Sequence, residues 1–324
     1  MKKILITGAT GFVGSHLTEL CVENGFDVIA FDRYNPNYNL GWLEKSKYKK
    51  EINFILGDIR DYDSVIKSMK DCKIVLHLAA LIGIPYSYIS PQAYLKTNVE
   101  GTYNILESAK NLDIEQAIIT STSEVYGSAK YVPIDEKHHL QAQSPYSASK
   151  ISADQLALSY WNSFQLPIKI VRPFNTYGPR QSSRAIIPSI IIQALNNKKE
   201  IKLGNINPTR DFTYVRDTCS AFLNILKLDS AFGDILNVGS NNEFTIEDIT
   251  KKILSKIGSK ANIKKESQRV RSKKSEVLRL VCDNSKILKY TTWKPTIKIE
   301  KGIDMTISWF KENRNLFKHD IYHV

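Results

Sequence analysis

The chain has 324 residues, 42% of them hydrophobic and 24% charged, which excludes a disordered or fibrous protein and leaves room for about two domains. Its net charge of +12 points to an anionic partner or to an exposed basic surface. No apolar run approaches the ~18 residues of a membrane span, and the four scattered cysteines predict neither a disulfide framework nor a metal site. We therefore expect a cytoplasmic protein without a membrane partner.

Short apolar runs rich in Ile and Val alternate with amphipathic stretches through the first half of the chain. Uninterrupted apolar strands that alternate with helices predict a parallel sheet covered on both faces. Right-handed crossovers then give an α/β fold with a doubly wound sheet, whose ligands bind at the carboxyl ends of the strands. The predicted strands are 4–7, 27–31, 52–56, 73–78, 116–120 and 168–172, and the predicted helices are 12–24, 61–70, 91–111 and 145–165.

The first strand runs directly into GATGFVG, with glycines at 8, 11 and 14. Gly8, Gly11 and Gly14 suit a sharp turn, a close approach to a pyrophosphate and the packing of a helix on a strand. Asp32 ends the next strand, where a carboxylate accepts hydrogen bonds from ribose hydroxyls and repels a 2′-phosphate. NAD is therefore favoured as the cofactor, while the neighbouring Arg33 keeps NADP open.

The same edge of the sheet receives the ends of the third and fourth strands. Asp58 and Ile59 follow the third strand, and the segment HLAA at 77–80 ends the fourth. We expect both to lie beside the adenine and the ribose, and residues 1–174 to form a Rossmann-type NAD-binding domain. The complete set of expected cofactor contacts adds Phe12, Val13, Leu78, Ala79, Ala80, Asn98, Tyr146, Lys150 and Pro173.

A Tyr followed four residues later by a Lys places both side chains on one helix face, where the ammonium can lower the pKa of the phenol and make it a base. With 16 tyrosines this spacing also arises by chance, and it occurs three times, at 126/130, 146/150 and 290/294. Only the middle pair has a helix start, because Ser144 can cap a helix that Pro145 begins. Tyr146 and Lys150 are therefore the predicted catalytic pair.

The segment TSTSEVYG at 120–127 ends the fifth strand at the same edge. A hydroxyl of Thr122 or Ser123 can hold a substrate hydroxyl against Tyr146, and Glu124 is a candidate acid/base in the pocket. Taken singly, these residues read equally well as a strand end and a turn cap. Their combination with the glycine loop and Tyr146/Lys150 favours the catalytic interpretation.

After residue 174 the chain becomes turn-rich, with shorter predicted helices near 184–197, 217–228, 245–257 and 299–313. We expect residues 175–324 to form mainly a smaller substrate-binding region, with segments near 210–240 returning to the Rossmann domain. Residues 251–275 contain ten Lys or Arg and one acid, so three quarters of the net charge lies there. No zinc-finger or RNA-recognition signature accompanies this segment, and nucleic acid is not expected as a partner.

GxxGxxG, a Ser/Thr-rich strand end and Tyr-x-x-x-Lys together resemble the extended short-chain dehydrogenase/reductase family over nearly the whole chain. Thr122-Ser123-Glu124 resembles the sugar-nucleotide 4,6-dehydratase branch, since 4-epimerases usually carry a small non-acidic residue at the position of Glu124. The segments 79–88, 131–138 and 275–280 are similar to the GDP-N-acetylglucosamine 4,6-dehydratases of legionaminic acid biosynthesis.

The resemblance implies a mechanism. Tyr146, assisted by Lys150 and Thr122, would take the proton of the sugar 4-hydroxyl while hydride passes to NAD. Glu124 would then remove the proton at carbon 5 as the 6-hydroxyl leaves as water, and hydride would return to carbon 6. Ser123 replaces an aspartic acid found in some relatives, so Glu124 could serve as both base and acid.

The resemblance also implies a diphosphate-sugar site and a homodimer formed by helices 91–111 and 145–165. Relatives often carry Arg-Pro where this chain has Arg271-Ser272, which leaves that contact open. A UDP-sugar 4-epimerase, a UDP-glucuronate decarboxylase and a non-catalytic NAD-binding regulator remain alternatives. The expected substrate contacts are Ile84, Tyr86, Thr122, Asn175, Arg184, Arg210, Arg271 and Glu276.

Overall fold

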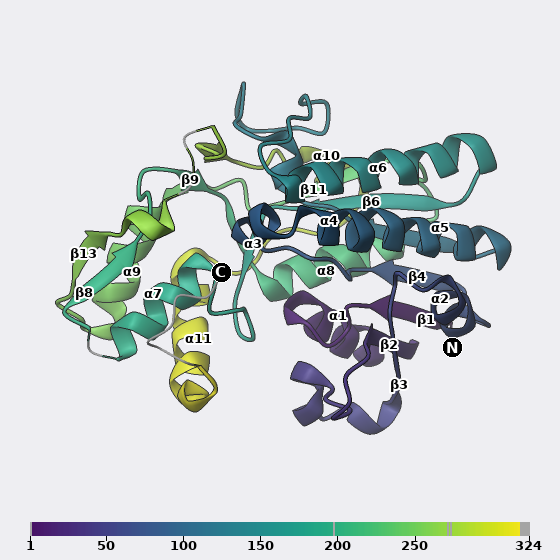
Figure 1. The fold of residues 1–324 in the computed structure, drawn as a ribbon, viewed down its shortest axis with the longest axis horizontal. Coiled ribbons are helices and arrows are strands. Elements are labelled where there is room, and N and C mark those ends of the chain that lie inside the picture. Colours follow the sequence, from purple (N-terminus) through teal and green to yellow (C-terminus); the bar gives the residue numbers. More distant parts are fainter. Residues whose placement is uncertain (1, 197, 271, 273, 318–324) are drawn as a thin grey trace.

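The computed structural model of the chain describes residues 2–196, 198–270, 272 and 274–317. A seven-stranded parallel sheet forms the centre of the molecule (Figure 1), with the strand order β11-β6-β5-β4-β1-β2-β3. The predicted doubly wound α/β fold is confirmed, and all six predicted strands are present. The strands of this sheet are β1 (Lys3–Thr7), β2 (Asp27–Arg33), β3 (Ile52–Gly57), β4 (Ile74–His77), β5 (Gln116–Thr120), β6 (Ile168–Pro173) and β11 (Ile235–Val238).

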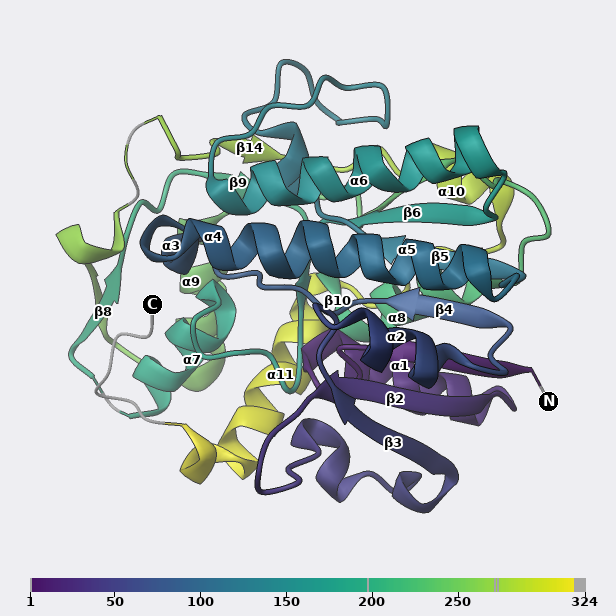
Figure 2. The same ribbon diagram turned by 45° about the vertical axis from the view of Figure 1, so that its right-hand side comes forward.

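Helices cover both faces of the sheet, as uninterrupted apolar strands require. In β1, Ile4 and Ile6 pack into one hydrophobic cluster and Leu5 into another, and all three are at most 1% exposed. α1 (Phe12–Glu23) and α8 (Val215–Leu226) pack together on the first face. α2 (Tyr62–Met69), α5 (Gly101–Asn111) and α6 (Pro145–Phe164) cover the second face, where α5 and α6 lie side by side (Figure 2).

The predicted helix 91–111 is interrupted. It begins as α4 (Pro91–Tyr94), continues as a π-helical segment, η3 (Leu95–Glu100), and ends as α5. A π turn holds an extra residue, and such segments are frequent at functional sites. Here it carries the buried side chain of Asn98, which bonds to both backbone polar groups of Leu81, in the loop after β4.

The chain after residue 174 forms a second region that faces the carboxyl ends of the sheet strands (Figure 1). It contains three small sheets, β10-β7, β12-β9-β14 and β13-β8. β11 nevertheless pairs with β6, so this part of the chain does return to the central sheet. The boundary at residue 174 stays a prediction.

The elements of the second region follow the turn-rich sequence. Its strands are β7 (Asn175–Tyr177), β8 (Glu200–Leu203), β9 (Thr209–Arg210), β10 (Phe212–Tyr214), β12 (Phe244–Thr245), β13 (Asn262–Lys265) and β14 (Arg279–Leu280). Its helices are α7 (Ile186–Leu195), α9 (Ile246–Ile257) and α11 (Ile299–Glu312), while α10 (Ser285–Tyr290) packs against β11 of the central sheet. Shorter turns elsewhere are η1 (Gly41–Lys45), η2 (Lys49–Glu51), α3 (Ile84–Ile89), η4 (Ser123–Tyr126), η5 (Ser267–Arg269) and η6 (Arg314–Leu316).

All four cysteines are buried free thiols. Within the part of the chain that the structure describes, no helix is long and apolar enough to cross a membrane, and no group of three potential metal ligands occurs.

Candidate active site

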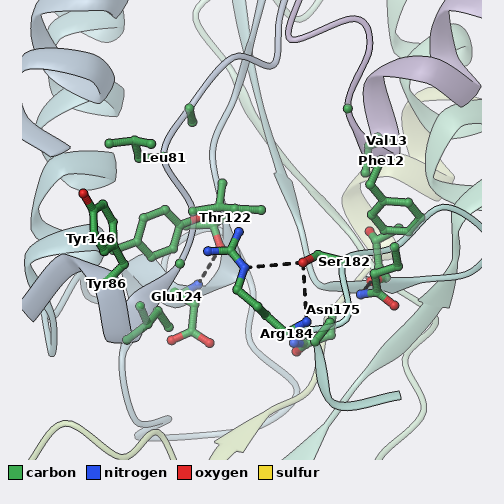
Figure 3. A pocket seen from close by; sticks show the side chains of 18 of the residues that line it. Phe12, Val13, Leu81, Tyr86, Thr122, Glu124, Tyr146, Asn175, Ser182 and Arg184 are labelled. Atoms are coloured by element: carbon green, nitrogen blue, oxygen red, sulfur yellow. Dashed lines mark hydrogen bonds between the residues drawn. The ribbon is translucent and has the colours of Figure 1, made fainter. Parts of the chain in front are cut away.

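A cavity of about 1290 Å³ lies at the carboxyl edge of the central sheet, where the second region covers it. Tyr146, Thr122 and Glu124 lie on one side of it and Phe12 and Val13 on the other (Figure 3). Both halves of the chain line the cavity, so the predicted ligand edge of the sheet and the predicted covering region meet at one site.

The glycine loop forms the cofactor end of the cavity. Gly8 has φ +68°, and a Cβ on Gly14 would lie 2.0 Å from the carbonyl oxygen of Gly8. The turn between β1 and α1 therefore closes only with glycine at these positions. Gly11 caps α1 without a side-chain hydrogen bond, and the first turn holds no acidic residue. The N–H groups at the start of α1 are thus available to an anion, which fits the pyrophosphate of a dinucleotide.

Asp32 ends β2 at the lining of the cavity. Its Oδ2 accepts hydrogen bonds from the backbone N and the Oγ1 of Thr10, at 2.8 and 2.6 Å, and its Oδ1 accepts from the N of Arg33 at 2.7 Å. The carboxylate therefore ties the glycine loop to β2. Its remaining lone pairs face the cavity, which suits the expected ribose hydroxyls.

Nearly all of the other predicted cofactor contacts line the cavity. Asn98 does not, because its amide donates to Leu81 and Ser149 and accepts from the Leu81 N. A cofactor contact of Asn98 stays a prediction. The residues that do line the cavity are Phe12, Val13, Arg33, Asp58, Ile59, Leu78, Ala79, Ala80, Tyr146 and Pro173.

Tyr146 lies in the first turn of α6, as its flanking residues predict. The Oγ of Ser144 accepts from the N of Ser147 at 3.1 Å, and Pro145 occupies the first helical position. The Tyr146 ring is 7% exposed and packs edge-on against Tyr94, with 6.2 Å between the ring centroids. The phenol is therefore held rigidly at the wall of the cavity.

The expected effect of Lys150 on the pKa of Tyr146 stays a prediction, because burial dominates the shift in the chain by itself. Burial raises the pKa of the Tyr146 phenol above its ordinary value; the Thr122 hydroxyl opposes this shift and the Glu124 carboxylate adds to it. The Nζ of Lys150 donates to the carbonyl of Thr120 at 2.6 Å, and Lys150 does not line the cavity. Burial lowers the pKa of Lys150, while the charge of Asp154 opposes this shift.

The turn η4 carries the rest of the predicted catalytic set. Thr122 caps the turn, its Oγ1 accepting from the N of Glu124 at 3.2 Å, and Thr122, Ser123 and Glu124 all line the cavity. The Oγ of Ser147 donates to the Glu124 carbonyl at 2.7 Å, which fixes η4 to α6. Within the described residues, no group hydrogen bonds to the carboxylate of Glu124, so it is available to a ligand.

The two rejected Tyr-Lys pairs lie outside the cavity lining. The Tyr126 hydroxyl is buried, donates to Asn237 and accepts from Arg172. Tyr290 ends α10 and is 39% exposed. The helix start at 144–145 therefore identified the one pair of the three whose tyrosine reaches the cavity.

The predicted substrate contacts also converge on the cavity, and Arg271 lies outside the described residues. Arg184 projects into the cavity beside Ser182 (Figure 3). The side-chain oxygen of Asn175 is buried and has no hydrogen-bond partner among the described residues. Arg210 lies 4.0 Å from Glu276. The residues brought together are Ile84, Tyr86, Thr122, Asn175, Arg184, Arg210 and Glu276.

Several lining residues are absent from the predicted contacts. Leu81 and Tyr88 follow β4, Asn205 lies between β8 and β9, and Gln268 lies in η5. The Tyr88 hydroxyl bonds to the Ser275 hydroxyl and so joins α3 to the segment before β14. Leu81 and Tyr88 lie in the segment 79–88, from which only Ile84 and Tyr86 were predicted as substrate contacts. Asn205 and Gln268 lie outside every motif and reach the cavity only through the fold.

The chain is similar to known nucleotide-sugar dehydratases and epimerases. The family model for GDP-mannose 4,6 dehydratase matches residues 5–306. The human dTDP-D-glucose 4,6-dehydratase is 31% identical over 98% of this chain and 92% of its own length. A putative UDP-glucose 4-epimerase of Methanocaldococcus jannaschii is 33% identical over 96% of this chain and 99% of its own. The crystal structure of DesIV, a dTDP-glucose 4,6-dehydratase from Streptomyces venezuelae with NAD bound, matches with a TM-score of 0.89 and 27% identity over 98% of this chain and 99% of that one.

Proposed function

The chain belongs to the GDP-mannose 4,6 dehydratase family, and we propose that it converts a nucleoside-diphosphate hexose, GDP-N-acetylglucosamine, to the 4-keto-6-deoxy sugar. The observation that carries this proposal is the carboxylate of Glu124, which lines the cavity with Tyr146 and has no hydrogen-bond partner among the described residues. A 4-epimerase needs a base for the sugar 4-hydroxyl only. A dehydratase needs a second acid/base for carbon 5 and for the departing hydroxyl.

NAD is the cofactor. The free N–H groups of α1, the glycine turn and Asp32 fit a dinucleotide without a 2′-phosphate. When bound, NAD supplies a transient hydride acceptor, so that carbon 4 is oxidised and carbon 6 later reduced without net consumption of the cofactor. The residues of the chain bind and orient the substrate and transfer protons.

Tyr146 is the proposed base for the sugar 4-hydroxyl. Its phenol is protonated in the chain alone, since burial raises its pKa. It therefore needs a hydrogen-bonded partner and nearby positive charge to lose its proton during catalysis. The Thr122 hydroxyl opposes the effect of burial. Lys150, four residues further along α6, is the proposed source of the positive charge.

Glu124 is the proposed base for the proton at carbon 5, which becomes acidic once carbon 4 is a ketone. The same carboxyl then protonates the departing 6-hydroxyl, which leaves as water. Ser123 lies beside it at 3% exposure, and a serine hydroxyl is a poor proton donor at neutral pH. We therefore assign both proton transfers to Glu124, and the proton that Tyr146 took from the 4-hydroxyl balances the one that carbon 5 regains when carbon 6 is reduced.

We infer the guanosine diphosphate and the N-acetyl group of the substrate from the resemblance of segments 79–88, 131–138 and 275–280 to enzymes of legionaminic acid biosynthesis. Arg184 and Arg210 supply guanidinium groups for the diphosphate, and Asn175 supplies an unpartnered amide oxygen. The proposal includes a homodimer in the cytoplasm, where the four free thiols would stay reduced.

A 4-epimerase is the second candidate, favoured by the 33% identity to a putative UDP-glucose 4-epimerase. Incubation with GDP-N-acetylglucosamine, UDP-N-acetylglucosamine and UDP-glucuronate, followed by mass spectrometry, distinguishes a dehydratase from an epimerase and from a decarboxylase. The dehydratase gives a product lighter by one water, the epimerase a product of unchanged mass, and a decarboxylase a product lighter by carbon dioxide. Loss of water from none of the three sugars would contradict the proposal.

A further inference from the structure

His77 ends β4 next to the cofactor side of the cavity, yet the proposed mechanism does not use it. Its ring is 1% exposed, and both nitrogens bond to threonine hydroxyls from other elements. Nδ1 lies 2.8 Å from the Oγ1 of Thr7, at the end of β1, and Nε2 lies 3.1 Å from the Oγ1 of Thr102, in α5. Both threonines are fully buried.

The direction of each hydrogen bond follows from the outer partners. The Thr102 hydroxyl donates to the Asn98 carbonyl at 2.6 Å, so it accepts from His77, and Nε2 carries the proton. Nδ1 of the neutral ring is then an acceptor, and the Thr7 hydroxyl donates to it. The remaining lone pair of Thr7 accepts from the N of Ala79 at 3.2 Å.

This arrangement of donors and acceptors requires that the imidazole ring of His77 is neutral. Burial and, to a smaller extent, the charge of Lys150 lower the pKa of His77 to about 3. An imidazolium would direct a second N–H at Thr7 and would disrupt the bonds on that side.

Each end of this chain of hydrogen bonds reaches the active site. On one side Thr7 holds Ala79, in the loop that lines the cavity after β4. On the other, the amide of Asn98 clamps Leu81 and donates to the Oγ of Ser149 at 2.9 Å. Ser149 in turn donates to the carbonyl of Tyr146 at 2.7 Å.

We propose that Thr7, His77 and Thr102 form a hydrogen-bond relay that positions the cofactor loop at 79–81 and the first turns of α6 relative to each other. None of the three lines the cavity, so they are positioning residues. The relay fixes the position of the loop 79–81 relative to Tyr146, and the inference rests on the proposed function only for the role of Tyr146.

The test compares Thr7→Val and Thr102→Val, which remove a hydroxyl at nearly constant shape, with Thr7→Ser and Thr102→Ser, which keep it. The full chain is purified, and the Kd for NAD, the melting temperature, and kcat and KM for the nucleotide sugar are measured. We expect each valine variant to bind NAD about tenfold more weakly and to lose about tenfold in kcat, the effect of about one hydrogen bond. The KM for the nucleotide sugar should stay unchanged, and each serine variant should stay within about twofold of the wild type.

The relay is overturned if the valine and serine variants at a threonine bind NAD with the same affinity, whether or not that affinity is lower than that of the wild type. It is also overturned if KM for the sugar rises with the loss of kcat, since a general loosening of the fold affects both ends of the cavity. The NAD affinities decide the relay even if the wild type converts no nucleotide sugar, which would overturn the proposed function alone. Should Thr102→Val not fold, the Thr7 pair makes the same comparison.

Discussion

The phenol of Tyr146 and the carboxylate of Glu124 reach one cavity from two elements, α6 and η4. The hydrogen bond from Ser147 to the Glu124 carbonyl holds these elements together, and the Thr122 cap fixes the turn. Both acid/base groups therefore belong to rigid backbone rather than to a free loop. A fixed spacing between them is needed when one residue acts at carbon 4 and the other at carbon 5.

Glu124→Gln should lower formation of the 4-keto-6-deoxy product by about 10²- to 10⁴-fold, because the amide can neither remove nor return a proton. Oxidation at carbon 4 depends on Tyr146 and should persist, so reduced nicotinamide absorbance should accumulate in a single turnover. Glu136→Gln is the matched control, because that carboxyl accepts from the N of Asn237 outside the cavity lining. Full product formation by Glu124→Gln would remove the residue from the mechanism.

The three Tyr-Lys pairs allow a comparison within one chain. Tyr146→Phe should lose about 10²- to 10⁴-fold in turnover, and Tyr290→Phe, at an exposed helix end, should lose none. Tyr126→Phe should keep its chemistry but lower the free energy of unfolding by about 1 to 3 kcal/mol, since Arg172 and Asn237 lose a buried partner. Steady-state rates and urea unfolding of the three variants test this assignment, and equal losses for Tyr146→Phe and Tyr290→Phe would contradict it.

Among the elements, α1 connects the cofactor loop to the second region. Its His16 Nε2 lies 3.1 Å from the Pro179 carbonyl, and its Glu19 accepts two hydrogen bonds from Arg180. The helix that begins at the glycine turn is thus held at its middle by the chain that follows β7. Burial and, to a smaller extent, the charge of Arg180 lower the pKa of His16 to about 4.

This shift predicts a dependence of stability on pH. An unfolded histidine titrates near 6.5, so between pH ~6.5 and ~4 the unfolded chain binds a proton that the folded chain does not. The free energy of unfolding should therefore fall as the pH decreases through this range, with about 3 kcal/mol from His16. Urea unfolding of His16→Gln should show an acid limb shallower by that amount, and exposed His139→Gln should not. An unchanged limb in His16→Gln would mean that the imidazole titrates normally in the fold.

Over the whole molecule, part of the charge of the basic segment 251–275 is paired with acids on other elements. Lys252 pairs with Glu300 and Lys256 with Asp304, both on α11, and Lys264 pairs with Glu200 on β8. The expected exposed basic surface is therefore partly neutralised, because Lys252, Lys256 and Lys264 are ion-paired across elements. This pairing reduces the local excess charge that a polyanion would need.

The proposed homodimer is also a property of the whole molecule. α6 and the segment 91–111 form one face, on which Leu95 is 53% and Tyr103 44% exposed. These residues and Ser152 line a shallow hollow of about 510 Å³. Apolar side chains around such a hollow are typical of a surface that a second copy covers.

Analytical ultracentrifugation should therefore find a dimer that Leu95→Glu dissociates, since a buried unpaired charge disfavours the interface. Leu288→Glu places the same charge on α10, where the leucine is 42% exposed, and should leave the dimer intact. A monomeric wild type, or a dimer that survives Leu95→Glu, would contradict this interface.

Local sequence was sufficient for the elements and for part of the site. Buried runs of Ile and Val predicted the six strands, and Ser144-Pro145 predicted the start of α6, because caps and strand patterns depend on neighbouring residues. Gly8, Gly11 and Gly14 predicted the turn at the cofactor end for the same reason. Since parallel strands end at one edge of the sheet, the sequence pattern also predicted that Tyr146 and the glycine loop line the same site.

Other features depend on contacts between residues distant in sequence, and only the tertiary structure decides them. The sign of the Tyr146 pKa shift follows from burial, which no spacing to Lys150 reveals. The amide of Asn98 is occupied because the π-helical segment places it within hydrogen-bond distance of Leu81. Lysines of the segment 251–275 form ion pairs with acids on other elements, as Lys252 does with Glu300. Desolvation, hydrogen-bond saturation and charge pairing are sums over all neighbours in space, and those neighbours exist only once the chain has folded.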